Sequence, residues 1–336
     1  MQAGAVLRLP VAVDDLAATC FATSPLYETV AALLALEAPH WVPDALPFVR
    51  RTRAALGADT LELPHVTPFL RGGDSYPEWL TPAPRSRRPG IGDELDVLAA
   101  TPPAQVRASL DRLARSQELP PLAAQLRASP ARMLSTMAEE LEAAHRRLLA
   151  DSWPDVQAML DADIVARALQ LADAGPGAVF RGLHAGLALT DGELVYSGPH
   201  LRRGDTAVQV AAGGIVLLPS AFVGQWCVVK RNTSSRTTVR YPARGAAGLW
   251  LAQQRPTTTP GLAALIGSAR AAMLGQLTTP RTTGSAARTA GITPSAASQT
   301  LGVLRNAGLV TRTRRGRESL HELTAIGRGL LVGDAA

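Results

Sequence analysis

Hydrophobic side chains recur at helical spacing through the first half of the chain. In SPLYETVAALLALE, Leu26, Val30, Leu33 and Leu34 fall on one helical face, and the Ser24-Pro25 pair in front of them is a typical helix start. The same period continues between residues 102 and 171, in VRASLDRLARS, RMLSTMAEELEAAHRRLLA and PDVQAMLDADIVARALQLA. These segments predict helices that turn an apolar face to a core.

Between these helices, Pro64–Gly90 is dense in proline and glycine. This composition is typical of a long loop, and its basic tip, RSRRPG, is typical of a solvated surface. We therefore expect a mobile surface excursion, whose tip could also touch DNA.

The pattern changes to that of strands after residue 182. GLALTDGELVYSG alternates on either side of Asp191-Gly192, a dipeptide that favours a two-residue hairpin turn. The other candidate strands are Val6–Leu9, Ala207–Val210, Gly214–Leu218, Gln225–Val229 and Thr237–Tyr241. We expect an α+β protein in which residues 1–242 form a domain of helices followed by an antiparallel sheet.

Residues 243–336 are expected to form a second, smaller domain after the hinge-like run PTTTP. Leu262–Leu277 carries an apolar stripe and predicts one helix. A short second helix, GSAARTA, follows, with Thr282 or Thr283 as its cap. Thr293 and Pro294 then start a third helix that ends at Gly308, so the two shorter helices form a helix-turn-helix.

The third helix has one polar face without large side chains. Ser295, Ser298 and Gln299 lie opposite its apolar positions, at the end where the helix starts. Such a face fits a DNA major groove, where glutamine can pair with adenine and serine can donate to bases or phosphates. A solvated polar face without a partner is the alternative.

A basic hairpin follows this helix and favours the DNA interpretation. LVTRTRRGRESLHELT has strand-like pieces around Arg315-Gly316, and its tip carries Arg312, Arg314 and Arg317 as well. Arginines on such a hairpin would contact phosphates or enter the minor groove. The charge distribution agrees: nine arginines and three acidic residues between 260 and 336 account for the whole net charge of +6.

The run from GSARAAMLGQL through PRTTGSAARTAGITPSAASQTLGVLRNAGLV to AIGRGLL resembles the winged-helix domain of ArsR-type bacterial transcription regulators. SPLYETVAALLAL and GGIVLLPSAFVGQW resemble the long N-terminal region of large actinobacterial members. The resemblance implies a homodimer on an inverted-repeat operator in double-stranded DNA, with DNA contacts from Thr293, Ser295, Ser298 and Gln299. Some members sense metals through cysteines in the third helix, but this helix has no cysteine, histidine or acid, so we expect no metal site.

We therefore expect a transcription regulator, a repressor rather than an activator, and not an enzyme. The first domain would sense a small-molecule effector or a partner. The candidate ligand residues are Trp41, Tyr196, Arg202 and Trp226, although core packing is the alternative role for the aromatic ones. No cofactor motif is present. Two other hypotheses stay open: an enzyme with a DNA-binding tail, using Asp191 and Glu193 near His184, and an adaptor that binds another protein.

Cysteine and hydropathy patterns bear on the compartment. Cys20 and Cys227 are far apart and form no metal-binding or disulfide pattern. No run approaches the roughly 18 apolar residues of a membrane span, and the N-terminus does not resemble a signal peptide. We expect a cytoplasmic protein without membrane contact.

Overall fold

A computed structural model describes residues 6–57, 61–71, 76–115, 117–198, 210, 213–230, 236–252, 260–277, 280–290, 292–315 and 318–332. The chain is of mixed α and β structure and forms two compact units, Met1–Ala247 and Gly248–Ala336. The boundary predicted after residue 242 falls where the last strand of the first unit ends, just before helix α10 (Ala246–Ala252).

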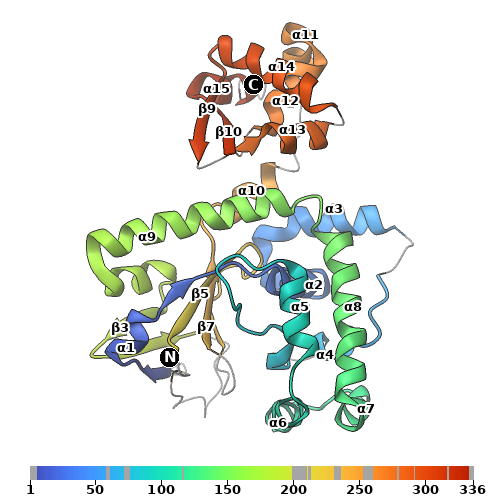
Figure 1. Ribbon diagram of the computed structural model, residues 1–336, viewed down its shortest axis with the longest axis vertical. Coiled ribbons are helices and arrows are strands. Elements are labelled where there is room, and N and C mark those ends of the chain that lie inside the picture. Colours follow the sequence, from blue (N-terminus) through green and yellow to red (C-terminus); the bar gives the residue numbers. More distant parts are fainter. Residues whose placement is uncertain are drawn as a thin grey trace. The chain divides into compact units, whose positions relative to one another are not determined.

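Helices make up most of the first unit (Figure 1). They are α1 Val13–Ala17, α2 Pro25–Glu37, α3 Leu46–Leu56, α4 Thr67–Leu70, α5 Ile91–Ala99, α6 Pro103–Ala114, α7 Leu122–Ala128, α8 Pro130–Leu148 and α9 Trp153–Leu183, with short 3-10 turns η1 Pro39–Trp41, η2 Pro43–Ala45 and η3 Glu78–Leu80. The predicted helical segments between residues 102 and 171 lie in α6, α8 and α9. Helix α9 runs on beyond the predicted segment and is kinked at Gly175, which has a φ of 73° and precedes Pro176.

Helix α2 begins as predicted, but residues on all of its sides are buried, whereas the sequence predicted only one buried face. The Ser24 hydroxyl accepts a hydrogen bond from the Tyr27 amide at 3.0 Å, and Pro25 is the first helical residue. Every residue from Pro25 to Leu33 is buried, because α5 and α8 pack against α2. Glu28 and Thr29 are therefore enclosed in the unit although their polarity suggests a surface position.

The Pro64–Gly90 segment is not the open loop that we expected. Where it is described, it contains α4 and η3, and its large apolar side chains are core residues: Trp79 is 1% exposed and Leu80 is fully buried. Prolines start or precede these short helices, which explains why a proline-rich composition coexists with a packed segment. The tip, with Arg85 and Arg88, is exposed.

One small sheet is antiparallel, as predicted. It has the order β1-β4-β3, formed by β1 Val6–Pro10, β3 Leu187–Thr190 and β4 Glu193–Ser197. Asp191 and Gly192 both have positive φ, 54° and 75°, as a two-residue turn of this hand requires. The hairpin prediction is therefore confirmed.

The second sheet contradicts the antiparallel prediction. Its order is β2-β5-β7-β6, from β2 Cys20–Phe21, β5 Ile215–Ser220, β6 Val228–Lys230 and β7 Thr237–Pro242. Strand β5 pairs in parallel with both β2 and β7, and only β6 runs antiparallel. All six residues of β5 are buried, which is typical of a parallel strand covered on both faces. Of the predicted strand Ala207–Val210, only Val210 is described.

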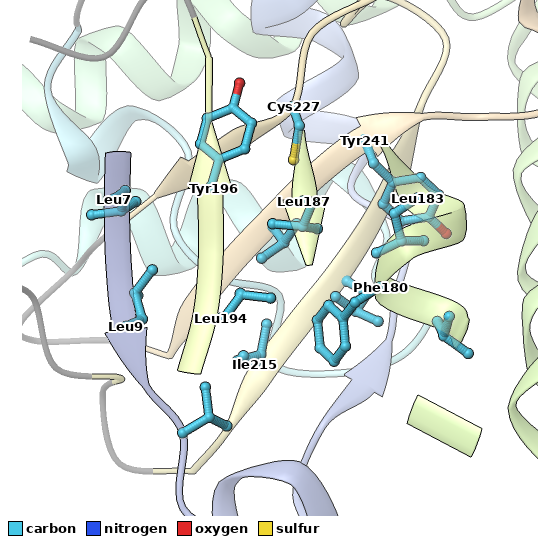
Figure 2. Packing of buried hydrophobic residues seen from close by; sticks show 14 of the residues in the cluster. Leu7, Leu9, Phe180, Leu183, Leu187, Leu194, Tyr196, Ile215, Cys227 and Tyr241 are labelled. Atoms are coloured by element: carbon cyan, nitrogen blue, oxygen red, sulfur yellow. The ribbon is translucent and has the colours of Figure 1, made fainter. Parts of the chain in front are cut away.

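The two sheets share one hydrophobic core with the end of α9. Leu7, Leu194 and Tyr196 of the first sheet meet Ile215 and Tyr241 of the second. Figure 2 shows Phe180 and Leu183 of α9 beside these strands. This core holds β5 and β7 in place, and the segment between β5 and β6 lines part of the cavity described below.

The second unit consists of small helices around a three-stranded antiparallel sheet of order β8-β10-β9. Its elements are α11 Pro260–Ile266, α12 Ser268–Gln276, β8 Arg281–Thr282, α13 Thr283–Ala290, α14 Pro294–Asn306, β9 Val310–Arg315, β10 Glu318–Leu323 and α15 Ala325–Val332. The predicted helix Leu262–Leu277 is in fact two, because Gly267 has a φ of 87° and separates α11 from α12. Ala286, Ala287, Ala297 and Leu301 lie in the core, where small side chains let α13 and α14 approach closely.

No helix in the described parts of the chain combines the length and the apolar composition of a membrane span.

Candidate functional site

Helix α14 presents a polar surface at its first turn. The Thr293 hydroxyl accepts a hydrogen bond from the Ala296 amide at 3.2 Å and caps the helix, and Pro294 is its first residue. Ala297, Leu301 and Leu304 are buried against the unit's core, so the opposite face is turned to solvent. Ser295, Ser298 and Gln299 are all exposed there.

The hairpin after α14 places arginines on one exposed face. Arg312 and Arg314 alternate along β9 and are both exposed, and the Arg312 guanidinium donates to the Ser319 hydroxyl of β10 at 2.6 Å. Arg315 is the last residue of β9, and its side chain is not described; Arg317 lies outside the described residues. Two of the four predicted hairpin arginines are thus located on the surface.

The hairpin is tied directly to the end of α14. Gly308 has a φ of 70° and turns the chain out of the helix, and the Leu309 amide bonds back to the Leu304 carbonyl at 3.0 Å. The Thr324 hydroxyl donates to the Gly308 carbonyl at 2.7 Å, and the Thr324 amide donates to the Leu309 carbonyl at 3.0 Å. These bonds hold the start of α15, the base of the hairpin and the end of α14 together.

A buried histidine also fixes the sheet against α13. His321 of β10 is 5% exposed, and its Nε2 lies 3.1 Å from the Thr283 hydroxyl. Burial, together with the positive charges of Arg312 and Arg305, lowers the pKa of His321. Because the lowered pKa favours the neutral imidazole, the positive charge of this hairpin comes from its exposed arginines and not from His321.

The first unit contains a cavity of about 470 Å³. Residues of α2 and the turn after it form one side, and residues around α4 and between β5 and β6 form the rest. The lining residues are Tyr27, Ala31, Leu34, Ala35, Glu37, Ala38, Trp41, Val42, Leu70, Arg71, Tyr76, Phe222, Val223, Trp226 and Val228. The size and the mainly apolar lining suit a small organic molecule.

Two of the predicted ligand residues meet in this cavity. The rings of Trp41 and Trp226 are 5.4 Å apart, edge to face, and the Trp226 indole donates to the Trp41 carbonyl at 2.9 Å. Tyr196 does not line it: the Tyr196 side chain is fully buried in the core shared by the two sheets, and its ring lies 5.9 Å from that of His184. Arg202 lies outside the described residues.

Sequence reasoning missed Tyr27 and Tyr76, which line the same cavity. A usable signal existed only in α2, where Ala31, Ala35 and Ala38 recur at helical spacing and leave room beside Tyr27. Tyr76 stands in the segment that we interpreted as a loop.

Next to the two tyrosines lies a fully buried guanidinium. Arg240 of β7 donates to the Tyr76 hydroxyl at 3.0 Å and to the Thr81 hydroxyl and carbonyl at 2.9 and 3.0 Å. Its Cζ lies 4.2 Å from the centre of the Tyr27 ring. Lys230 donates to the same Thr81 hydroxyl at 2.6 Å and lies 5.0 Å from the Tyr76 ring centre; burial, more than the charge of Arg240, lowers the Lys230 pKa.

Two buried carboxyl groups lie nearby but bind other groups. Glu28 accepts the Ala221 amide at 2.9 Å, and Glu94 accepts the Ser24 hydroxyl and the Leu26 amide at 2.7 and 2.8 Å. Burial raises the pKa of each to about 7, although these hydrogen bonds and Arg240 favour the charged forms. Near neutral pH each carboxyl is therefore only partly ionised.

The described residues contain no group of three histidine, cysteine or acidic side chains that could hold a metal ion. Asp191 belongs to the hairpin turn, and Glu193 pairs with Arg8 at 2.9 Å, while His184 bonds to the Gln225 carbonyl and the Gly186 amide, both at 2.9 Å. Each of these residues has a structural partner or turn position, so they do not form an evident acid–base pair.

Residues 99–247 match the model of a family of unknown function, DUF5937. The matched region includes α6 to α9, the strands β3 to β7, Trp226 and Arg240, and it ends where the first compact unit ends. Neither a curated protein nor a solved structure matches the chain. The similarity therefore places this region among related sequences without indicating an activity.

Proposed function

We propose that the protein is a dimeric, sequence-specific DNA-binding transcription regulator, acting as a repressor, whose second unit is a winged helix-turn-helix. The single observation that carries this proposal is the exposed face of Ser295, Ser298 and Gln299 at the start of α14, on a helix bonded to an arginine-bearing hairpin. The order α13, α14, β9, β10 is that of the ArsR-type domain which the sequence resembles.

In this proposal α14 is the recognition helix. Its first turn enters the major groove, where the Gln299 amide is suited to a bidentate pair with adenine. The capped N-terminus of α14 favours a nearby phosphate, and Arg312 and Arg314 of the hairpin neutralise phosphates on the flank. Because the hairpin is bonded to the end of α14, phosphate contacts made by the arginines would also position the helix.

The net charge supports the same proposal. The excess of +6 resides between residues 260 and 336, so attraction to DNA is concentrated on the unit that carries α14. The rest of the chain is neutral overall and is free to serve another role. We assign that role to an effector site in the cavity of the first unit.

The test is selection of duplexes from a randomised pool by the full-length protein, followed by binding titrations at several salt concentrations. We expect enrichment of an inverted repeat, with half-sites about 34–36 Å apart or a multiple of this, and an affinity that falls as salt rises. Absence of salt-sensitive binding to any duplex would contradict the proposal.

A further inference from the structure

The cavity of the first unit has two phenol groups that donate no hydrogen bond within the described part of the chain. Tyr27 and Tyr76 both line it. Among the described residues, neither hydroxyl has a hydrogen-bond acceptor, and the Tyr76 oxygen itself accepts from Arg240 Nη1 at 3.0 Å. Both O–H groups are therefore available to donate to a bound molecule.

The charge behind these phenols is incompletely balanced. Arg240 is fully buried, yet its hydrogen-bond partners in the described chain are a phenol, a hydroxyl and a carbonyl, all neutral. No described carboxylate lies within ion-pair distance, and Nε has no hydrogen-bond partner there. Glu28 and Glu94 interact with Arg240 from farther away, and each is only partly ionised near neutral pH. Because a buried charge is costly without a counter-charge, the site favours a negative group.

The aromatic rings of the two tyrosines are not free to attract a cation. The Tyr27 ring already contacts the Arg240 guanidinium, and the Tyr76 ring contacts Lys230. A cationic ligand would approach rings that already face positive charges, and it would find two hydroxyl protons instead of acceptors. This arrangement disfavours ammonium ligands despite the abundance of aromatic residues.

The remainder of the cavity is apolar and suits a flat ring. Trp41, Trp226 and Phe222 supply aromatic surface, and Ala31 and Ala35 of α2 contribute small apolar side chains to the lining. The charged residues of the lining, Glu37 and Arg71, pair with each other at 3.0 Å. They satisfy each other's charges and leave the tyrosine protons as the main polar feature.

We propose that the cavity binds a planar aromatic molecule bearing an acidic or strongly accepting oxygen group, with that oxygen hydrogen-bonded by Tyr27 and Tyr76. Arg240 strengthens the Tyr76 donor by bonding to its oxygen, since hydrogen bonds in a chain polarise one another. This inference rests on the proposed function only in treating the ligand as an effector; the binding itself requires no DNA.

The test uses two probes that share one ring system and differ in charge. Full-length protein is titrated by calorimetry with 1-naphthoate and with 1-naphthylmethylammonium, while the fluorescence of the five tryptophans, Trp41 and Trp226 among them, provides a second readout. We expect saturable binding of the anion and an affinity for the cation at least about tenfold lower, because one charge-assisted hydrogen bond is worth roughly that factor.

Tyr27→Phe removes one donor without removing the ring, and its hydroxyl has no partner in the described protein to lose. We expect this variant to bind naphthoate about tenfold more weakly. Tyr196→Phe makes the same chemical change outside the cavity and is expected to bind like the parent. Circular dichroism of both variants checks that the fold is retained.

Equal binding of both probes, unchanged naphthoate affinity in Tyr27→Phe, or no saturable binding of naphthoate would each overturn the assignment. The DNA titrations described above are run on the same preparation. If the protein binds DNA but not naphthoate, only this inference is rejected. If it binds naphthoate but not DNA, the proposed function is rejected and the cavity assignment stays in place.

Discussion

Under the proposed function, individual side chains of the second unit would make two kinds of DNA contact. Gln299 can read a base because its amide offers one donor and one acceptor together, whereas an arginine on a phosphate carries no sequence information. Both kinds are exposed in the structure: Gln299 on α14 and Arg312 and Arg314 on β9. The two roles predict different responses to mutation.

Gln299→Ala should lower the affinity for the selected operator by about 1–3 kcal/mol per half-site and relax the base preference. The loss is expected for the operator but not for a scrambled duplex, since only base contacts disappear. Fluorescence anisotropy with both duplexes measures the difference. Asn306→Ala removes an exposed amide from the other end of α14 and serves as the control; an equal loss in the control would argue against base reading by Gln299.

Arg314→Ala should weaken binding to operator and scrambled duplex alike, because a phosphate contact is lost. The slope of log affinity against log salt should decrease by about one per subunit. Arg132→Ala removes an equally exposed arginine from α8 of the first unit and should leave the slope unchanged. A specific loss on the operator alone would show that Arg314 reads bases.

Glu28 makes the stability of the first unit depend on pH. Burial raises its pKa to about 7, above the usual value of 4.5, so the folded state binds the proton more tightly than the unfolded chain. Its contribution to stability is complete below pH 4.5 and is lost as the pH rises through about 7. The unfolding free energy of the parent should therefore decrease between pH 5 and 8. In Glu28→Gln this decrease should be smaller by up to about 3 kcal/mol.

Urea unfolding of parent and Glu28→Gln at pH 5, 6, 7 and 8 measures this difference. The difference between the two proteins isolates Glu28 from Glu94, whose pKa is also raised to about 7 and which stays in both. Parallel stability curves for the two proteins would contradict the assignment.

At the scale of elements, the turn between α14 and the hairpin depends on backbone geometry more than on contacts. Gly308 has a φ of 70°, and a Cβ placed there would have open space around it. A substitution at this position is therefore opposed by left-handed backbone strain alone. Gly302, within α14, also has open space but an ordinary helical backbone, which makes it a matched comparison.

Gly308→Ala should destabilise the second unit by about 1–2 kcal/mol, the cost of left-handed backbone for a residue with a Cβ. Gly302→Ala should stabilise it by roughly 0.5–1 kcal/mol, because alanine loses less conformational freedom in a helix. Thermal unfolding followed by circular dichroism compares the two. If Gly302→Ala and Gly308→Ala destabilised the unit to a similar extent, the turn geometry would be contradicted.

On the scale of the whole molecule, the chain separates a strongly charged unit from a nearly neutral one. Residues 260–336 carry the net charge, and the first unit holds the cavity and the buried polar cluster. If two copies present two α14 helices to DNA, the spacing between half-sites must match the dimer.

Inserting five base pairs between the half-sites of the selected operator should abolish tight binding, because the second half-site rotates to the opposite side of the duplex. Inserting ten base pairs should return both half-sites to the same side of the duplex, since about 10–10.5 base pairs make one turn. The affinity should then recover much more than with five. Gel-shift titrations with the three operators measure this, and sedimentation of the free protein reports its dimerisation. Equal binding to all three operators would contradict a fixed dimer.

Local signals in the sequence predicted local structure well. The Ser24 and Thr293 caps, the Asp191-Gly192 turn and the break at Gly308 are all found, because each depends on residues within a few positions of one another. The same reasoning failed at Gly267, where an apolar stripe continues across a glycine that in fact ends the helix. It also failed in Pro64–Gly90, because composition does not reveal that Trp79 is buried.

By itself, then, the amino-acid order determined where most helices and turns begin and end, the polar face of α14 and the placement of charge in the second unit. Only the tertiary structure decided that β5 lies parallel to β2 and β7, and that Trp41, Trp226 and Tyr76 share a cavity close to Arg240. Capping and turn formation involve neighbours along the chain. Strand order and the convergence of side chains depend on contacts between residues distant along the chain, such as Cys20 with Val216 and Tyr76 with Arg240, which are chosen by packing of the whole core.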